Sequence, residues 1–209
     1  MRATLQHGEE VERIRNTYAY YDSTGSEQAK RDHLNPGNRR IVAEREELLR
    51  SLLSESGLLP LSGLRVLDVG CGVGGFLAHL ARLGADEGDL YGIDLLPDRI
   101  EIARRSFPAI SFSCGNAASL EFSDGHFDMV SFSTVFSSVL DEEMALRMGA
   151  EADRVLKPGG AVLWCDFRYD NPTNPHTRGM SRRRIRHLFP NAELDLRTVT
   201  LLPPLARRL

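Results

Sequence analysis

One glycine-rich stretch limits what this 209-residue chain can fold into: residues 66–75, which read VLDVGCGVGG. Val66, Leu67 and Val69 form a short apolar run, as expected of a parallel strand buried on both faces. An apolar helical pattern follows, so the glycines occupy the turn between strand and helix. Glycine reaches backbone angles that other residues avoid, and its missing side chain lets a ligand lie against the chain. The helix start adds free N–H groups and a partial positive charge. The stretch therefore predicts a cradle for a nucleotide-like cofactor.

The glycine spacing alone leaves the cofactor open. Gly70, Gly72 and Gly75 also satisfy the dinucleotide pattern G-x-G-x-x-G, and a plain tight turn fits as well. Asp68 favours a ligand other than a dinucleotide. Its carboxylate lies near the end of the strand, where it would repel a pyrophosphate and attract an ammonium group. S-adenosylmethionine (SAM) carries an ammonium and a sulfonium and no phosphate. The stretch DVGCGVG resembles the first motif of class I SAM-dependent methyltransferases.

Four further stretches follow in the order typical of this family. They are Asp94 at the end of the second expected strand, GNA at residues 115–117, FDMV at residues 127–130 and LKPGG at residues 156–160. Together they resemble the methyltransferase type 11 group, which includes the ubiquinone/menaquinone C-methyltransferases and many natural-product O- and N-methyltransferases.

Strands alternate with helices throughout residues 64–167. This alternation predicts an α/β fold: a Rossmann-like, doubly wound, mostly parallel sheet with helices on both faces and right-handed crossovers. We expect strands at residues 66–69, 90–95, 110–114, 127–133, 161–167 and 193–201, and helices at 9–20, 36–55, 97–106, 142–156 and 181–189. The LKPGG stretch should be a turn. The family's sheet has seven strands, the last antiparallel, and no residues remain for it, so we expect that strand to be missing.

The two flanks of the chain differ from the centre. We expect residues 1–34 to form an N-terminal lid or tail, and residues 35–209 to form the SAM-binding methyltransferase domain. The N-terminal segment brings Tyr18, Tyr20 and Tyr21 close together. These rings either pack the segment onto the domain or line the substrate pocket.

The resemblance implies specific cofactor contacts. Asp94 would accept hydrogen bonds from both ribose hydroxyls, Asn116 and Ala117 would pair with the adenine edge, and Ser133 would lie near the methionine part. The full expected set is Asp68, Gly70, Cys71, Gly72, Asp94, Leu95, Asn116, Ala117 and Ser133.

The implied reaction is direct displacement at the SAM methyl carbon by an acceptor nucleophile, an oxygen or a nitrogen of a small molecule. Much of the catalysis can then be alignment in a dry pocket. A hydroxyl nucleophile benefits from a base. His176 is the first candidate, because the ordinary pKa of histidine lies near neutrality, and Asp166 is the second. Many relatives carry a histidine after the fourth strand, where this chain has Ser137 and Ser138, neither of them a credible base alone.

Substrate identity is expected to lie in residues 168–179, RYDNPTNPHTRG, which two Asn-Pro pairs make extended and stiff. The segment leaves the edge of the sheet where ligands bind in open α/β folds. Candidate substrate contacts are Tyr18, Tyr21, Arg168, Tyr169 and Arg178, of which Arg168 or Arg178 could hold a carboxylate or phosphate. The following run RRRIRH, residues 182–187, is either an anion site or a solvated helix face.

Composition narrows the partners and the compartment. A formal net charge of −3 gives no general attraction to nucleic acid or to an anionic membrane. No apolar run approaches the ~20 residues of a membrane-spanning helix, and the N-terminus is too polar for a signal peptide. The three cysteines lack C-x-x-C spacing, so we expect buried free thiols in a reducing cytoplasm and no metal site. The oligomeric state stays open.

Two other functions compete with methyl transfer. One is a non-catalytic SAM-binding protein, which the missing last strand and the absent histidine would suit. The other is an NAD(P)-dependent oxidoreductase. The short-chain type needs a Tyr-x-x-x-Lys pair, and neither Lys30 nor Lys157 follows a tyrosine at that spacing.

Overall fold

The computed structural model describes residues 2–24 and 35–199, which fall into two compact units. One unit comprises residues 1–15 and 61–192, and the other comprises residues 16–60 and 193–209. The division lies inside the first helix rather than at residue 35. The expectation that residues 1–34 form a lid or tail stays a prediction. Residues 1, 25–34 and 200–209, which the expected lid, domain and sixth strand include in part, lie outside the described part.

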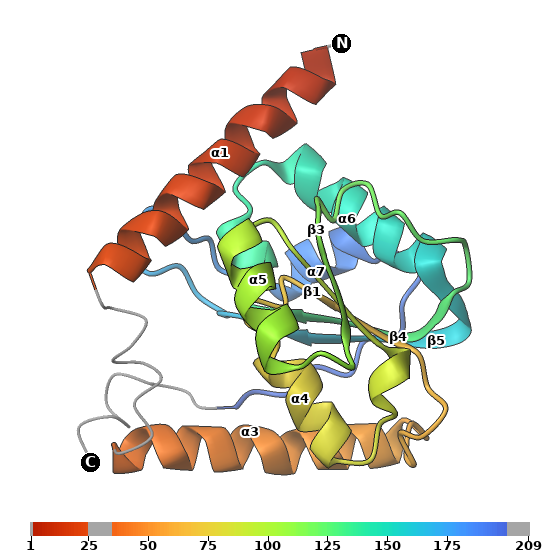
Figure 1. Ribbon diagram of the computed structural model, residues 1–209. Coiled ribbons are helices and arrows are strands. Elements are labelled where there is room, and N and C mark those ends of the chain that lie inside the picture. Colours follow the sequence, from red (N-terminus) through yellow and green to blue (C-terminus); the bar gives the residue numbers. More distant parts are fainter. Residues whose placement is uncertain (1, 25–34, 200–209) are drawn as a thin grey trace. The chain divides into compact units, whose positions relative to one another are not determined.

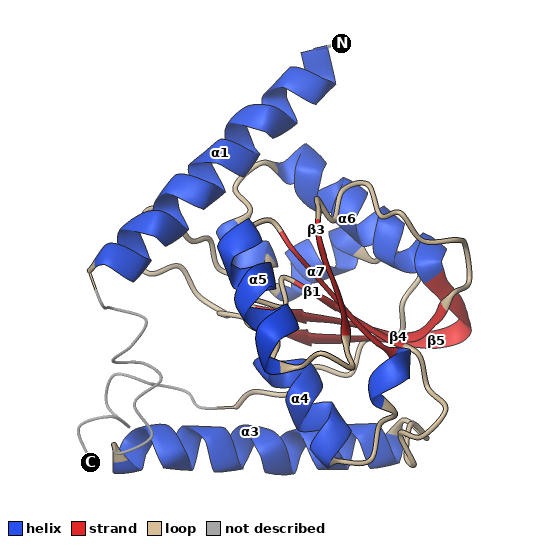
Figure 2. Ribbon diagram, in the orientation of Figure 1, coloured by secondary structure: helices blue, strands red, loops and turns tan. Residues whose placement is uncertain are grey.

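The first unit is built on a parallel sheet of five strands with the order β3-β2-β1-β4-β5. Every pairing between its neighbouring strands is parallel. Figure 2 shows these strands at the centre of the unit with helices around them. The doubly wound α/β prediction is confirmed, and the first four strands match expectation to within one residue. The strands are β1 (Val66–Val69), β2 (Leu90–Asp94), β3 (Ser111–Cys114), β4 (Phe127–Ser133) and β5 (Leu156–Cys165).

Helices connect β1 to β2, β2 to β3 and β4 to β5, whereas residues 115–126 connect β3 to β4 as a loop (Figure 1). The chain moves outward from β1 through β2 to β3, returns to β4 beside β1, and then continues to β5. Because crossovers between parallel strands are right-handed, this reversal puts the early and late helices on opposite faces of the sheet. These helices are α4 (Gly75–Arg82) and α5 (Pro97–Ser106) before the reversal, and α6 (Glu142–Val155) and α7 (Arg182–Leu188) after it; short 3-10 turns occupy η1 (Glu87–Asp89) and η2 (Phe136–Ser138).

Local side chains set where several helices begin. The Asp141 carboxylate accepts a hydrogen bond from Met144 N (3.0 Å) at the start of α6, and the Ser181 hydroxyl accepts one from Arg184 N (3.2 Å) at the start of α7. These contacts satisfy N–H groups that have no partner within the helix.

The strand β5 differs from expectation at both ends. It begins at Leu156, so the LKPGG residues fall inside the strand, and it ends at Cys165, before Asp166. Pairing with β4 runs from Phe127↔Leu156 to Met129↔Ala161, which leaves residues 157–160 bulged opposite Asp128. Lys157 Nζ contacts both Asp128 carboxylate oxygens at 2.8 Å and holds the bulge to β4. The family's FDMV and LKPGG stretches therefore form one ion-paired structure.

The second unit contains α3 (Pro36–Glu55) and the C-terminal part of α1 (Arg2–Ser23), a helix longer than the expected residues 9–20. The bounds predicted for α3 are confirmed, and the Asn35 side chain caps it by accepting from Asn38 N at 3.0 Å. No helix in the described ranges has both the length and the apolar character needed to span a membrane.

The prediction of a sixth strand at residues 193–201 is wrong over its described part, because residues 193–199 form no strand. The expected strand rested on apolar side chains at alternating positions. These side chains are not buried, and Leu196 is 38% exposed. Arg197 makes ion pairs with Asp195 and Glu55 instead. A strand is stabilised by ladder hydrogen bonds to a neighbour, and alternation alone does not supply that neighbour.

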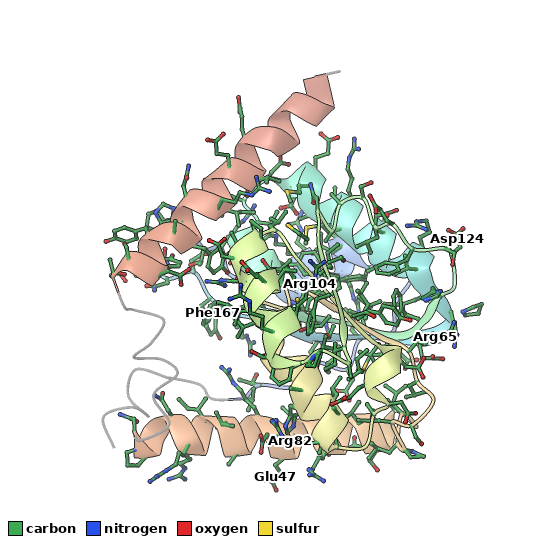
Figure 3. The ribbon with its side chains drawn as sticks, in the orientation of Figure 1. Glu47, Arg65, Arg82, Arg104, Asp124 and Phe167 are labelled. Atoms are coloured by element: carbon green, nitrogen blue, oxygen red, sulfur yellow. The ribbon has the colours of Figure 1, made fainter. Side chains whose placement is uncertain are left out.

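The core of the first unit includes a cluster of three phenylalanines beneath the segment after β4. The Phe132 and Phe136 ring centroids lie 4.6 Å apart, and Phe136 meets the Phe189 ring edge-on at 5.8 Å. On the opposite face, Arg104 of α5 donates twice to Phe112 O of β3 (3.1 and 2.8 Å; Figure 3). Both contacts hold helices against the sheet.

Substituting Gly149 tests the packing of α7 on α6. A Cβ at Gly149 would stand 2.6 Å from Leu188 O, a backbone atom that cannot move without shifting α7. We expect Gly149→Ala to lower the free energy of unfolding by about 1–3 kcal/mol, measured by urea denaturation. Gly8→Ala is the control, because Gly8 is also helical and has open space around it. Equal stability of the two variants would contradict the tight α6–α7 contact.

Candidate active site

The glycine turn after β1 folds back onto the end of β2. Gly70 N and Cys71 N both donate to Ile93 O, at 2.8 and 3.1 Å. Gly72 N donates to the Asp94 carboxylate at 2.8 Å. The backbone of Ile93 and the side chain of Asp94 thus hold the turn against the end of β2. This is the carboxyl end of the sheet, where ligands bind in open α/β folds.

Backbone conformation explains the glycines. Gly70, Gly72 and Gly74 have φ of +70°, +55° and +83°, values that side chains with a Cβ rarely adopt. Gly74 is the N-cap of α4, so the third required glycine is this one and not Gly75, which the sequence pattern singled out. A Cβ on Gly70 would lie 2.6 Å from Val135 Cγ2. The turn is therefore closed on one side by the segment after β4.

Asp94 connects the ends of three strands. Its carboxylate oxygens accept from Gly72 N (2.8 Å) and Leu96 N (2.9 Å), and its main-chain oxygen accepts from Gly115 N (3.0 Å). The residue is 8% exposed. A carboxylate oxygen can accept two hydrogen bonds, so each retains capacity for a ligand hydroxyl. The expected ribose-binding residue is thus fixed at the turn.

Asp68 lies at the same end of the sheet and is 2% exposed. Its Oδ1 accepts from Ser131 Oγ at 2.6 Å, and the two residues are register partners on β1 and β4. Burial raises the pKa of Asp68 to about 7; the Ser131 hydrogen bond opposes this rise, and the charge of Asp94 adds to it. Sequence reasoning did not pair Ser131 with Asp68. The signal was one polar residue in β1 and one in β4, at positions that the strand register pairs.

The expected adenine-side residues follow the ends of β2 and β3. Asn116 Oδ1 accepts from Ala118 N at 2.9 Å, which shapes the loop and leaves one acceptor position on the oxygen. Ala117 is 8% exposed. Leu95 O accepts from Arg15 Nε at 3.4 Å. Gly115 N, just before Asn116, donates to Asp94 O, so this loop lies next to the end of β2.

The segment after β4, which closes one side of the glycine turn, forms a second wall of the candidate site. Ser133 ends β4, is exposed, and pairs with Cys165 of β5. Thr134 follows with φ of +57°, an uncommon value for a residue with a β-branched side chain. Thr134 N donates to Cys165 O at 2.8 Å, which holds this conformation. The bend directs Val135 against Gly70.

Asp166, the second candidate base, connects β5 to η2. Its carboxylate accepts from Ser137 N and from Phe167 N, each at 2.9 Å. Burial raises the pKa of Asp166, and the hydrogen bonds from Ser137 and Phe167 oppose the rise. These contacts position the segment after β4. Figure 3 shows Phe167 at the opposite end of the sheet from Arg65, which precedes β1.

The loop after β5 is held at its ends and exposed in its middle. Arg178 N donates to Ser137 O (2.8 Å), and Met180 N donates to Phe167 O (2.7 Å). His176, the first candidate base, lies in the exposed part, with its N–H bonded to Asn174 Oδ1 at 3.1 Å. The structure thus brings Arg178 to the wall of the site and leaves His176 on the outer part of the loop.

The remaining candidate substrate residues divide between the two units. The Arg168 guanidinium lies 5.4 Å from the centre of the Tyr169 ring, which is 69% exposed. Tyr18 and Tyr21 contact each other edge-on at 5.9 Å and belong to the second unit. Their place at the substrate pocket stays a prediction.

Sequence reasoning missed a contact from the start of α1. Glu10 Oε1 accepts from Leu140 N (2.6 Å), and Arg13 Nη2 donates to Ser138 O (2.6 Å). Burial works to raise the pKa of Glu10, but the hydrogen bonds from Arg13 and Leu140 outweigh it and the pKa is lowered. An i, i+3 acid–base pair on a helix is common, so the sequence held no signal for this long-range contact.

Substituting Asp68 tests its buried environment through pH. Between the ordinary pKa of 3.8 and about 7, the folded protein holds a proton that the unfolded chain has lost, so stability falls as pH rises across this window. The loss, on the order of 4 kcal/mol, is complete above pH ~7. Asp68→Asn carries no charge and keeps an acceptor for Ser131. We expect it to unfold at a higher temperature than wild type at pH 8, with the difference shrinking towards pH 4.

Exposed Asp153→Asn is the matched control for that experiment. Thermal unfolding of all three proteins at several pH values gives the comparison. A difference between Asp68→Asn and wild type that does not change with pH would show that burial does not disfavour the charged form.

Comparison with known proteins agrees with this geometry. Residues 66–160 match the model of a family described as a methyltransferase domain. The ubiquinone/menaquinone biosynthesis C-methyltransferase UbiE of Shewanella sp. (strain W3-18-1) is 32% identical over 124 residues, which are 56% of this chain and 47% of that protein. The chain thus spans about half the length of the curated relatives it matches.

Solved structures share the fold. A SAM-dependent methyltransferase from Methanosarcina mazei aligns with a TM-score of 0.52 at 24% identity, covering 65% of this chain and 86% of that one. The [4+2]-cyclase SpnF aligns with a TM-score of 0.54 at 26% identity, covering 68% and 56%. Residues 66–160 thus match a methyltransferase domain, and the chain shares the fold of a SAM-dependent methyltransferase.

Proposed function

We propose that the protein transfers a methyl group from SAM to a small-molecule acceptor at an oxygen or nitrogen atom. One observation carries this proposal: the N–H of Gly72 is engaged by the buried Asp94 carboxylate, and a second buried carboxylate, Asp68, lies at the end of β1 beside the same turn. The turn therefore offers negative charge where a pyrophosphate would need N–H donors. A ligand with an ammonium group and two ribose hydroxyls suits that charge.

The residues present fit SAM. Gly70, Gly72 and Gly74 present no side chain to a ligand, and a Cβ at Gly70 would collide with Val135. In this proposal Asp68 binds the ammonium group, Asp94 the ribose and Asn116 the adenine. SAM supplies a methyl group on a sulfonium, which is a good leaving group for direct displacement.

The chain's own contribution is mainly alignment of the acceptor. Asp166 holds the wall of the site by accepting from Ser137 N at 2.9 Å, and Arg178 extends that wall through Ser137 O. A hydroxyl acceptor must also lose its proton. His176 is proposed as the base, since its loop leaves the end of β5, with Asp166 as the second candidate.

The methyl group could also be transferred to a carbon atom of the acceptor. UbiE is named as a C-methyltransferase, so an acceptor carbon is the alternative that this relative adds. Because the chain spans about half the length of that protein, its acceptor does not transfer to this one by similarity.

A second candidate function is SAM binding without methyl transfer. The observation that favours it is the neighbour SpnF, which has the fold and is described as a cyclase. Fold therefore does not establish the reaction. Conversion of SAM to S-adenosylhomocysteine in the presence of candidate acceptors separates the two functions.

Calorimetric titration tests the cofactor. We expect SAM and S-adenosylhomocysteine to bind the wild type and NADH not to bind. Asp94→Ala removes the ribose acceptor and the contact with Gly72 N, so we expect at least tenfold weaker binding of both ligands. Asp98→Ala, an exposed acid on the following helix, is the control. Unchanged SAM affinity in a folded Asp94→Ala variant, or binding of NADH, would overturn the proposal.

Replacing His176 tests the base. Loss of a general base lowers turnover by about 10²- to 10⁴-fold. We expect His176→Ala to lower the rate of S-adenosylhomocysteine formation while leaving SAM affinity intact, because His176 lies on the exposed loop and not at the glycine turn. Unchanged turnover would remove His176 from the mechanism and direct attention to Asp166→Asn.

A further inference from the structure

Arginines line a cavity formed by the loop after β5, the start of α6 and α7. Its volume is about 560 Å³, and its walls include Arg178, Arg183, Arg184, Arg186 and Glu142. We call it the arginine cavity. Its size suits a small molecule, since pockets for such ligands span about 300–1,000 Å³.

A smaller cavity of about 290 Å³ adjoins it through shared walls. Arg178 and Arg184 line both cavities, and Arg168 and Asp170 belong to the smaller one. The two cavities together carry five arginines against the carboxylates of Asp170 and Glu142. This excess of positive charge is local, because the chain as a whole has a net charge of −3.

One carboxylate serves two guanidinium groups within the arginine cavity. Glu142 Oε2 lies 3.3 Å from Arg178 Nη1 and 3.3 Å from Arg184 Nε. A guanidinium has five N–H donors, so one shared oxygen leaves most of this donor capacity to other partners. The wall of the cavity is therefore undersupplied with negative charge.

Arg184 is the unusual member of the set, because it is 7% exposed. Its Nη2 donates to Val139 O at 3.0 Å, while its buried Nε makes no hydrogen bond of good geometry. Burial lowers the pKa of Arg184, and the charge of Glu142 opposes that effect. A buried guanidinium is stabilised by a further anion that accepts from it.

The packing of α7 presents the other arginines to the cavity. Ile185, Leu188 and Phe189 are buried, at 5%, 4% and 8% exposure. Arg183 and Arg186 lie on the exposed side of this helix. A solvated face therefore does not describe Arg184, whereas the exposed Arg183 and Arg186 border the arginine cavity.

A short series of contacts joins the arginine cavity to the glycine turn. Val135 Cγ2 lies 2.6 Å from the position that a Cβ of Gly70 would take, and two residues later Ser137 O accepts from Arg178 N at 2.8 Å. We propose that the arginine cavity binds a carboxylate or phosphate group of the methyl acceptor. The assignment to an acceptor rests on the proposed methyl transfer, whereas the anion site rests on the geometry alone.

Binding of simple anions to the full chain tests the site. Inorganic pyrophosphate and malonate are the probes, titrated calorimetrically with the wild type, Arg183→Gln and Arg182→Gln. Arg182 and Arg183 are exposed neighbours on α7, but Arg182 does not line either cavity. We expect about tenfold weaker binding of the preferred probe by Arg183→Gln, the loss of one charged hydrogen bond, and no change with Arg182→Gln. Arg178→Gln should resemble Arg183→Gln. The probe that binds tells phosphate from carboxylate.

Titration of S-adenosylhomocysteine with the same proteins separates the two proposals. We expect its affinity to be equal in all variants and unaffected by the anion. No anion binding by the wild type, equal weakening by Arg182→Gln, or displacement of S-adenosylhomocysteine by pyrophosphate would overturn the anion site. Anion binding with the expected variant pattern, but no S-adenosylhomocysteine binding, would support the site and overturn the methyl-transfer proposal.

Discussion

The closure of the glycine turn onto the end of β2 is the contact on which the rest of the site depends. Ile93 O accepts two N–H groups from the turn and the Asp94 carboxylate accepts a third. This closure requires positive φ at Gly70 and Gly72, where the backbone would be strained with any other residue. Because Asp94 also binds the loop after β3 through its main-chain oxygen, the geometry of one turn sets the positions of three strand ends.

Features that depend on neighbouring residues were predictable from the sequence. The bounds of α3, α5 and β4 follow from caps and apolar periodicity, and the motif order indicates the parallel sheet. The outcome at residues 193–201 was not predictable, because the alternation of apolar and polar residues does not show whether a neighbouring strand is there to pair. Likewise, the bulge that joins Lys157 to Asp128 depends on register between two strands, which neither stretch records alone. Asp68 stands out in the sequence as a candidate site residue, whereas its hydrogen bond to Ser131 depends on the register between β1 and β4.

The segment after β4 organises the wall of the site opposite Asp94. Ser137 is fully buried; its N–H donates to Asp166 and its carbonyl accepts from Arg178. Glu10 and Arg13 contact the same segment from α1. Residues from α1, the end of β5 and the loop after β5 therefore all contact residues 137–140. The sequence has serines there in place of a histidine, and these serines were assessed only as possible bases. Their backbone groups, which no side-chain pattern reveals, give this segment its structural role.

The raised pKa of Asp68 has a thermodynamic consequence for the cradle. A carboxyl group with a pKa of about 7 is protonated in about half of the molecules at neutral pH. A cation that binds to its charged form competes with that proton, so occupancy of the cradle and release of a hydrogen ion to solvent are two sides of one equilibrium. In the proposed cofactor site, the buried Ser131–Asp68 pair would therefore link binding of an ammonium group to the hydrogen-ion concentration of the surroundings.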